Sequence, residues 1–136
     1  PLTVVGDANV NQKEYYLTCK AEAGPLTTFL PYTSTEKIIA LMDQHACLVI
    51  PSLFETYSLV GWEGFARGMN VVANDAPDMN ETLAPVATLA DINNAEAFKT
   101  AVSKALNEPL GQKKSQTVLE QYAWDHIVRR IFVAYR

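Results

Sequence analysis

Cysteine is scarce in this sequence, cations are sparse over most of its length, and long apolar runs are absent. The two cysteines, Cys19 and Cys47, stand too far apart for a C-x-x-C redox pair or for the paired spacing of a zinc site. The longest apolar run, residues 46–51, is far short of the ~20 residues that cross a bilayer. We therefore expect both thiols to be reduced core groups and the domain to be cytoplasmic.

The charge is divided unevenly along the chain. Residues 1–98 hold four bases against 12 acids, whereas residues 99–136 hold seven bases and three acids, and the net charge is −4. This balance argues against nucleic acid as the main partner. A phosphate group bound in the first part would depend on backbone amides and helix dipoles, because that part has no cluster of cations.

Length and composition favour one folded domain, residues 1–136, because 49% of the residues are hydrophobic and 19% are charged. Short β-branched runs alternate with amphipathic stretches, which predicts an α/β fold with one Rossmann-like parallel sheet of about five strands flanked by helices. The predicted strands are residues 2–6, 27–30, 46–50, 71–74 and 86–89. The predicted helices are residues 11–23, a helix beginning at 34, then 59–67, a short turn at 78–83, 94–106, 112–122 and 125–135.

The loop after the third predicted strand is the first place to expect a ligand, since open parallel sheets bind ligands at the carboxyl ends of their strands. Residues 51–72 hold three of the six glycines. Gly61 and Gly64 fall inside a predicted helix, where each costs about 1 kcal/mol relative to alanine. Close packing of the helix on the sheet and close approach of a ligand explain them equally well.

Two carboxylates, Glu55 and Glu63, lie in the same segment. A carboxylate accepts hydrogen bonds from sugar hydroxyls, and the exposed amides at the start of the predicted helix, around Ser58, suit a phosphate. This combination fits a phosphorylated sugar. In the alternative, Glu55 caps the helix and Glu63 is a solvated surface residue.

Residues 51–72, P-S-L-F-E-T-Y-S-L-V-G-W-E-G-F-A-R-G-M-N-V-V, resemble the signature of retaining nucleotide-sugar glycosyltransferases of the GT-B fold, especially glycosyltransferase family 4 (glycosyl transferases group 1). That family typically shows P-S-x-x-E-G-F-G-L-x-x-x-E-A-x-A-x-G-x-P-V-V, whose two acids match Glu55 and Glu63. The segments V-V-G-D at 4–7, F-L-P-Y at 29–32 and Y-A-W-D at 122–125 also resemble family motifs. The resemblance covers nearly the whole chain and corresponds to the C-terminal, donor-binding half of such an enzyme.

The resemblance implies a metal-independent transfer of a sugar from a UDP-, GDP- or ADP-linked donor to an acceptor hydroxyl. It implies that Glu63 holds the ribose hydroxyls, that Glu55 holds the transferred sugar, and that the amides of residues 57–59 reach the sugar and diphosphate. The predicted site residues are Glu55 as the catalytic residue and, for donor binding, Glu63, Tyr57, Ser58, Leu59, Thr56, Gly6 and Tyr32.

Several positions depart from the family pattern. Thr56 and Ser58 replace two glycines, and Asn70 replaces a proline. We expect Trp62 to be a packing residue and Arg67 to be solvated.

Family members begin this half with a strand and helix carrying G-R-x-x-x-x-K-G, and no such motif precedes Leu2. That strand would be central, so we expect the sheet to close up around the gap or to borrow a neighbour. The acceptor-binding N-terminal domain is also missing, so we expect a fragment without turnover by itself; in the full enzyme, association with a membrane surface is an open possibility.

Two rival functions remain. One is a non-catalytic α/β binding or assembly module derived from the fold. The other is a different enzyme on the same fold, such as a sugar-nucleotide epimerase or a glycogen phosphorylase relative, although these lack the E-x7-E segment. Among other candidate residues, His45 and His126 have no partner at metal-ligand spacing. Asn74 ends a predicted strand, where it either touches the donor or forms a turn.

Overall fold

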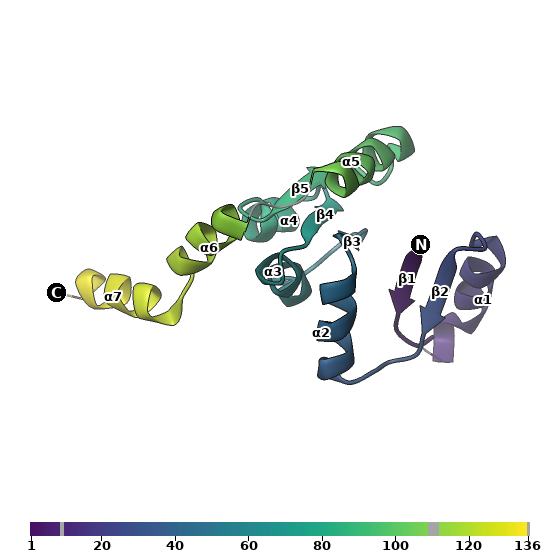
Figure 1. Ribbon diagram of the computed structural model, residues 1–136, viewed down its shortest axis with the longest axis horizontal. Helices are drawn as coiled ribbons and strands as arrows, with labels where there is room; N and C mark the ends of the chain where they lie inside the picture. The colour runs from purple at the N-terminus through teal and green to yellow at the C-terminus, as the bar shows by residue number, and fades with distance from the viewer. Residues whose placement is uncertain (9, 109–111, 136) are drawn as a thin grey trace. The chain divides into compact units, whose positions relative to one another are not determined.

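Two compact units of parallel strands and helices make up the computed structural model, which describes residues 1–8, 10–108 and 112–135 (Figure 1). The first unit comprises residues 1–40 and the second residues 41–136. Every strand pair is parallel, so the predicted α/β class is confirmed. The single domain predicted for residues 1–136 stays a prediction.

Each predicted strand and helix is present within a few residues of its expected range. The strands are β1 (Leu2–Val5), β2 (Thr27–Leu30), β3 (Cys47–Ile50), β4 (Asn70–Asn74) and β5 (Ala87–Ala90). The helices are η1 (Val10–Gln12), α1 (Lys13–Glu22), α2 (Thr35–Gln44), α3 (Leu59–Ala66), α4 (Pro77–Leu83), α5 (Ala95–Asn107), α6 (Gln112–Gln121) and α7 (Trp124–Ala134).

The expectation of one five-stranded sheet is wrong for the described residues. β1 and β2 form a two-stranded sheet, and β3, β4 and β5 form a three-stranded sheet in that order. A parallel ladder can extend only where another strand meets its free edge. Among the described residues, no strand pairs with the second edge of β1 or of β3, so the two ladders stay separate and do not close up into one.

In the first unit, α1 packs beside the two-stranded sheet through an aromatic contact. The rings of Tyr16 and Phe29 meet edge to face with centroids 5.8 Å apart. The ammonium of Lys20 lies 5.3 Å from the Tyr16 ring and 5.7 Å from the Phe29 ring. This contact attaches α1 to β2 and completes a β-α-β unit.

In the second unit, α3 and α4 lie on one side of the three-stranded sheet and α5 lies on the other (Figure 1). The core between the sheet and its helices consists of Ile50, Phe65, Val71, Ala73, Met79, Leu83 and Val86. Trp62 joins it from α3, where its indole N–H donates to the carbonyl of Thr82 at 3.2 Å and its ring lies 4.4 Å from that of Tyr122. Its predicted packing role is confirmed.

Gly61 and Gly64 bring α3 close to its neighbours. A Cβ at Gly61 would lie 2.7 Å from one methyl of Leu83 and 3.2 Å from Ile50 Cδ1, and a Cβ at Gly64 would lie 2.7 Å from a methyl of Leu48. Both glycines are buried. Close packing therefore explains both, and of the two interpretations of these glycines the structure supports the packing one.

Arg67 is not simply solvated, contrary to the expectation. Its guanidinium forms a two-point ion pair with Asp43 near the end of α2, with Nε 2.7 Å from Oδ1 and Nη2 in contact with Oδ2. The hydrogen bonds from Arg67 lower the pKa of the Asp43 carboxyl and raise that of the guanidinium. The two residues are far apart in sequence, so helix periodicity could not reveal the pair.

The structure also accounts for Asn70 and for the two cysteines. The Asn70 side chain donates to the carbonyls of Ala105 and Glu108 at 2.8 and 2.6 Å, capping the end of α5, which a proline at this position could not do. Both cysteines are free, as predicted, and half-buried. Desolvation raises the pKa of the Cys47 thiol.

The two helix glycines should respond differently to alanine. Gly61→Ala should destabilise the protein by roughly 1 kcal/mol, because Leu83 and Ile50 are buried and cannot move aside, so overpacking outweighs the helix propensity gained. Gly64→Ala should be neutral to within about 0.5 kcal/mol, because half-buried Leu48 can turn away. Urea unfolding measures both, and equal losses would contradict the packing argument.

The Asp43–Arg67 pair should make stability depend on pH. Because the folded-state pKa of Asp43 is lowered, the pair stabilises above the unfolded pKa of about 4 and its contribution is lost as pH falls below that value. Asp43→Asn should therefore be less stable than wild type at pH 7 and equal to it in strong acid. Added salt should shrink the difference at pH 7, since the pair is exposed.

Candidate functional site

The loop of residues 51–58 joins β3 to α3 at the carboxyl edge of the three-stranded sheet. Asn74, the last residue of β4, is 5% exposed and holds this edge together. Its side-chain N–H donates to the carbonyl of Ser52 at 3.1 Å, and its carbonyl oxygen accepts from the N–H of Ile92 at 3.2 Å. One amide group thus links the end of β4 to the segments that follow β3 and β5.

Glu55 is held in this loop by two hydrogen bonds. Ser52 Oγ donates to Glu55 Oε1 at 2.8 Å, which orients the carboxylate. The backbone N–H of Glu55 donates to Asp78 Oδ2 at 2.6 Å, which ties the loop to the start of α4. No described residue donates to Oε2, so the half-buried carboxylate keeps one oxygen available to a ligand.

The alternative role of Glu55 as the cap of α3 is wrong. The N-cap of α3 is Ser58, and no side chain caps the helix. The N–H groups of Leu59 and Val60 open the helix and have no intrahelical acceptor, so they can bind an anion. Polar donors and a carboxylate therefore lie in one short segment.

Glu63 is exposed on α3. No described residue forms a hydrogen bond or an ion pair with its carboxylate. It is four residues after Leu59, which is 66% exposed, so the two share a helix face. Thr56 and Tyr57 are exposed in the loop before the helix.

Ser58 adopts a backbone conformation that favours glycine. Its φ of 54° and ψ of 61° are left-handed, which costs a non-glycine residue about 1–2 kcal/mol. The side chain is 5% exposed, and its hydroxyl has no hydrogen-bond partner among the described residues. An unsatisfied buried hydroxyl costs about 1–3 kcal/mol more. The sequence alone did not lead us to expect this strain. The glycine that the family pattern has at position 58 indicates it, because glycine tolerates a left-handed backbone.

Gly6 and Tyr32 follow the two strands of the first unit. Gly6 has a φ of +146°, which disfavours a side chain, and its N–H donates to the carbonyl of Leu30 at 3.0 Å. The N–H of Tyr32 donates to Asp7 Oδ2 at 2.9 Å, and the Tyr32 side chain is exposed. Asp7 thus ties the ends of β1 and β2 together, a role that its place in the sequence did not indicate.

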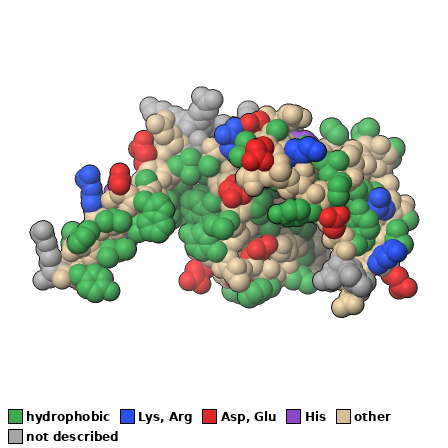
Figure 2. Space-filling view, turned by 90° about the horizontal axis from the view of Figure 1, so that it is seen from below, with side chains coloured by type: hydrophobic (Ala, Val, Ile, Leu, Met, Phe, Trp, Pro, Cys, Tyr) green, Lys and Arg blue, Asp and Glu red, His purple; other side chains and the backbone are tan. Residues whose placement is uncertain are grey.

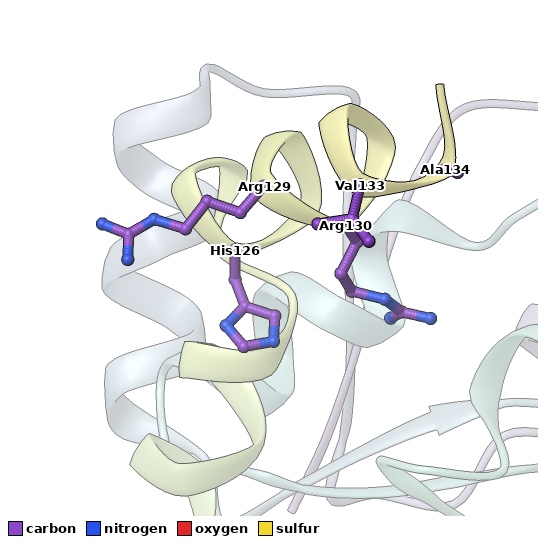
Figure 3. A pocket seen from close by; sticks show the side chains of 5 residues that line it. All are labelled: His126, Arg129, Arg130, Val133 and Ala134. Atoms are coloured by element: carbon purple, nitrogen blue, oxygen red, sulfur yellow. The ribbon is translucent and has the colours of Figure 1, made fainter. Parts of the chain in front are cut away.

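An open hollow on α7 contains none of the predicted site residues. It is lined by His126, Arg129, Arg130, Val133 and Ala134, and Figure 3 shows the two guanidinium groups pointing away from each other. All five residues belong to one helix, so the hollow is a helix flank. Arg129 and Arg130 are exposed.

The same helix presents apolar side chains to solvent, visible as green atoms at the left end of Figure 2.

No group of three or more metal-ligating side chains occurs in residues 1–8, 10–108 and 112–135. Within those ranges no helix combines the length and the hydropathy needed to cross a membrane. His45 instead bonds the carbonyl of Leu41 through Nδ1 at 2.7 Å.

The chain is similar to known proteins in family pattern, in sequence and in structure. The family described as Glycosyl transferases group 1 matches residues 1–126. The MMP alpha-(1->4)-mannosyltransferase of Mycolicibacterium hassiacum is 26% identical over 113 residues, 75% of this chain and 27% of that protein. The structure of sucrose-phosphate synthase from Thermosynechococcus elongatus aligns with a TM-score of 0.75 and 22% identity, over 99% of this chain and 37% of that one.

The chain thus spans well under half the length of either protein. The structural likeness confirms the predicted fold, parallel strands flanked by helices as in part of a GT-B enzyme.

Removing the Asn74 side chain should loosen this edge of the sheet. Asn74→Ala leaves the part-buried carbonyl of Ser52 and the N–H of Ile92 without these partners, which should lower the free energy of unfolding by about 2 kcal/mol. Amide exchange at Ile92 should accelerate. Asn93→Ala, which removes only an exposed contact with Asp91, is the control and should change little.

Proposed function

Because the chain belongs to the glycosyl transferases group 1 family, we propose that it is the donor-binding portion of a retaining glycosyltransferase. The donor is a nucleoside diphosphate sugar linked to uridine, guanosine or adenosine. The sugar is a hexose, a choice supported by the relative named as a mannosyltransferase. The acceptor is a hydroxyl group presented by another part of the enzyme.

The observation that carries the proposal is the fixed carboxylate of Glu55 beside an uncapped helix end. Ser52 orients Oε1, Asp78 holds the backbone, and Oε2 is left to accept a hydrogen bond from a sugar hydroxyl. Four residues later α3 begins with free N–H groups. Sugar and phosphate recognition thus come from adjacent residues of one loop.

In the proposed mechanism the helix end stabilises the leaving group. Negative charge develops on the diphosphate as the bond to the sugar breaks, and N–H groups aimed at it by α3 favour that charge. Glu55 keeps the sugar in place, and Glu63, on the exposed face of α3, binds the ribose hydroxyls. Thr56 and Tyr57, in the loop before α3, add further donor contacts, and none of these steps requires a metal. Gly6 and Tyr32 stay predicted donor-binding residues of the first unit.

The test is an amide NMR titration of the 136-residue chain with UDP, GDP and ADP and their hexose conjugates. Shifts centred on residues 55–63 with one base preferred are expected. Glu63→Gln should weaken the nucleoside diphosphate and its conjugate alike, by about tenfold, because the ribose is common to both. Glu55→Gln should weaken only the conjugate.

Glu120→Gln, an exposed change on α6, is the control and should leave both affinities unchanged. A folded protein whose spectrum no nucleotide perturbs would reject the proposal and favour a non-catalytic module with this fold. Equal losses for both ligands in Glu55→Gln would reject the assignment of Glu55 to the sugar.

A further inference from the structure

Ser58 combines two unfavourable features at one position. It is the only non-glycine residue of the described chain with a positive φ, and its Oγ is the only buried side-chain nitrogen or oxygen there without a hydrogen-bond partner. Gly68, with a φ of +83°, shows that the chain uses glycine at another left-handed position nearby. Glycine at 58 would remove both features, so the fold itself gives no reason for serine.

The usual reason for serine before a helix does not apply either. A serine at the N-cap normally has an extended backbone and accepts a hydrogen bond from an N–H in the first turn. Ser58 has a left-handed backbone and forms no such bond. Ser58 nevertheless directly precedes Leu59 and Val60, whose N–H groups lack intrahelical acceptors.

The charge around the helix limits what can bind there. The only base among residues 41–98 is Arg67, which follows α3 at its opposite end and is paired with Asp43. Within residues 41–98, the groups left to bind an anion at the start of α3 are therefore neutral donors. A serine hydroxyl adds a third donor to the two amides, and phosphate oxygens accept from all three.

We propose that Ser58 is a phosphate-binding residue, whose hydroxyl donates to a phosphate oxygen of a nucleoside diphosphate bound at the N-terminus of α3. The inference rests on the proposed function and adds a side-chain donor at a position where glycine offers only its backbone. Donation to a ligand requires the hydroxyl to turn out of its buried position about the Cα–Cβ bond. Strained residues of this kind gather at ligand sites, where binding uses the group that the fold leaves unsatisfied.

The test compares wild type with Ser58→Ala, Ser58→Gly and the control Ser103→Ala, an exposed change on α5. The ligands are UDP, GDP, ADP, the corresponding nucleosides and pyrophosphate, measured by calorimetry and NMR. Ser58→Ala and Ser58→Gly should weaken the preferred nucleoside diphosphate and pyrophosphate by about tenfold. Nucleoside affinity and the control protein should be unchanged, and Ser58→Gly should unfold at higher urea than wild type.

Each contrary result has a separate meaning. Equal affinity of wild type and Ser58→Ala for the nucleoside diphosphate would overturn this inference and leave the proposed function standing. An equal loss for nucleoside and nucleoside diphosphate would also overturn it, because the hydroxyl would then act on the structure of the loop. If wild type binds no nucleotide, the proposed function fails and this inference fails with it.

Discussion

The close approach of α3 to the three-stranded sheet is the constraint on which the site depends. At Gly61 the backbone of α3 lies so near its neighbours that a Cβ would clash with Leu83 and make a tight contact with Ile50. The start of α3 is therefore held beside the end of β3, and residues 51–58 must make the connection between them. The left-handed residue Ser58 is the last step of that connection, so the strain at the helix end accompanies the tight packing of the helix body.

Polar groups then fix the base of the same loop. Asn74 bonds the carbonyl of Ser52, and Asp78 bonds the N–H of Glu55, so two neighbouring elements hold the loop from the side of the sheet. Its outer side is different, because Leu53 and Phe54 are about three-quarters exposed. The loop thus has a fixed polar base and an open apolar rim, which suits a carboxylate that must keep its orientation while a ligand enters.

Recognition of a phosphorylated ligand by this loop finds no unpaired cation among residues 41–98, which build the three-stranded sheet and α3. Acidic residues outnumber basic ones through residue 98, and the one base between residues 41 and 98 is already paired. Backbone N–H groups, the dipole of α3 and a serine hydroxyl are weaker individually than an arginine, but they are fixed in place before the ligand arrives. Membership in the glycosyl transferases group 1 family is consistent with such a site.

The sequence by itself determined the kinds and limits of the helices and strands, because hydrophobic periodicity and β-branched runs act over a few residues. It also determined the spacing of Glu55 and Glu63, since both belong to one loop and helix. Tertiary structure decided what depends on distant residues: the division of the strands into two sheets, the packing role of Gly61, the partner of Arg67 and the three-way link through Asn74. Each of these joins groups more than ten residues apart, and no local pattern encodes which groups meet across such a separation.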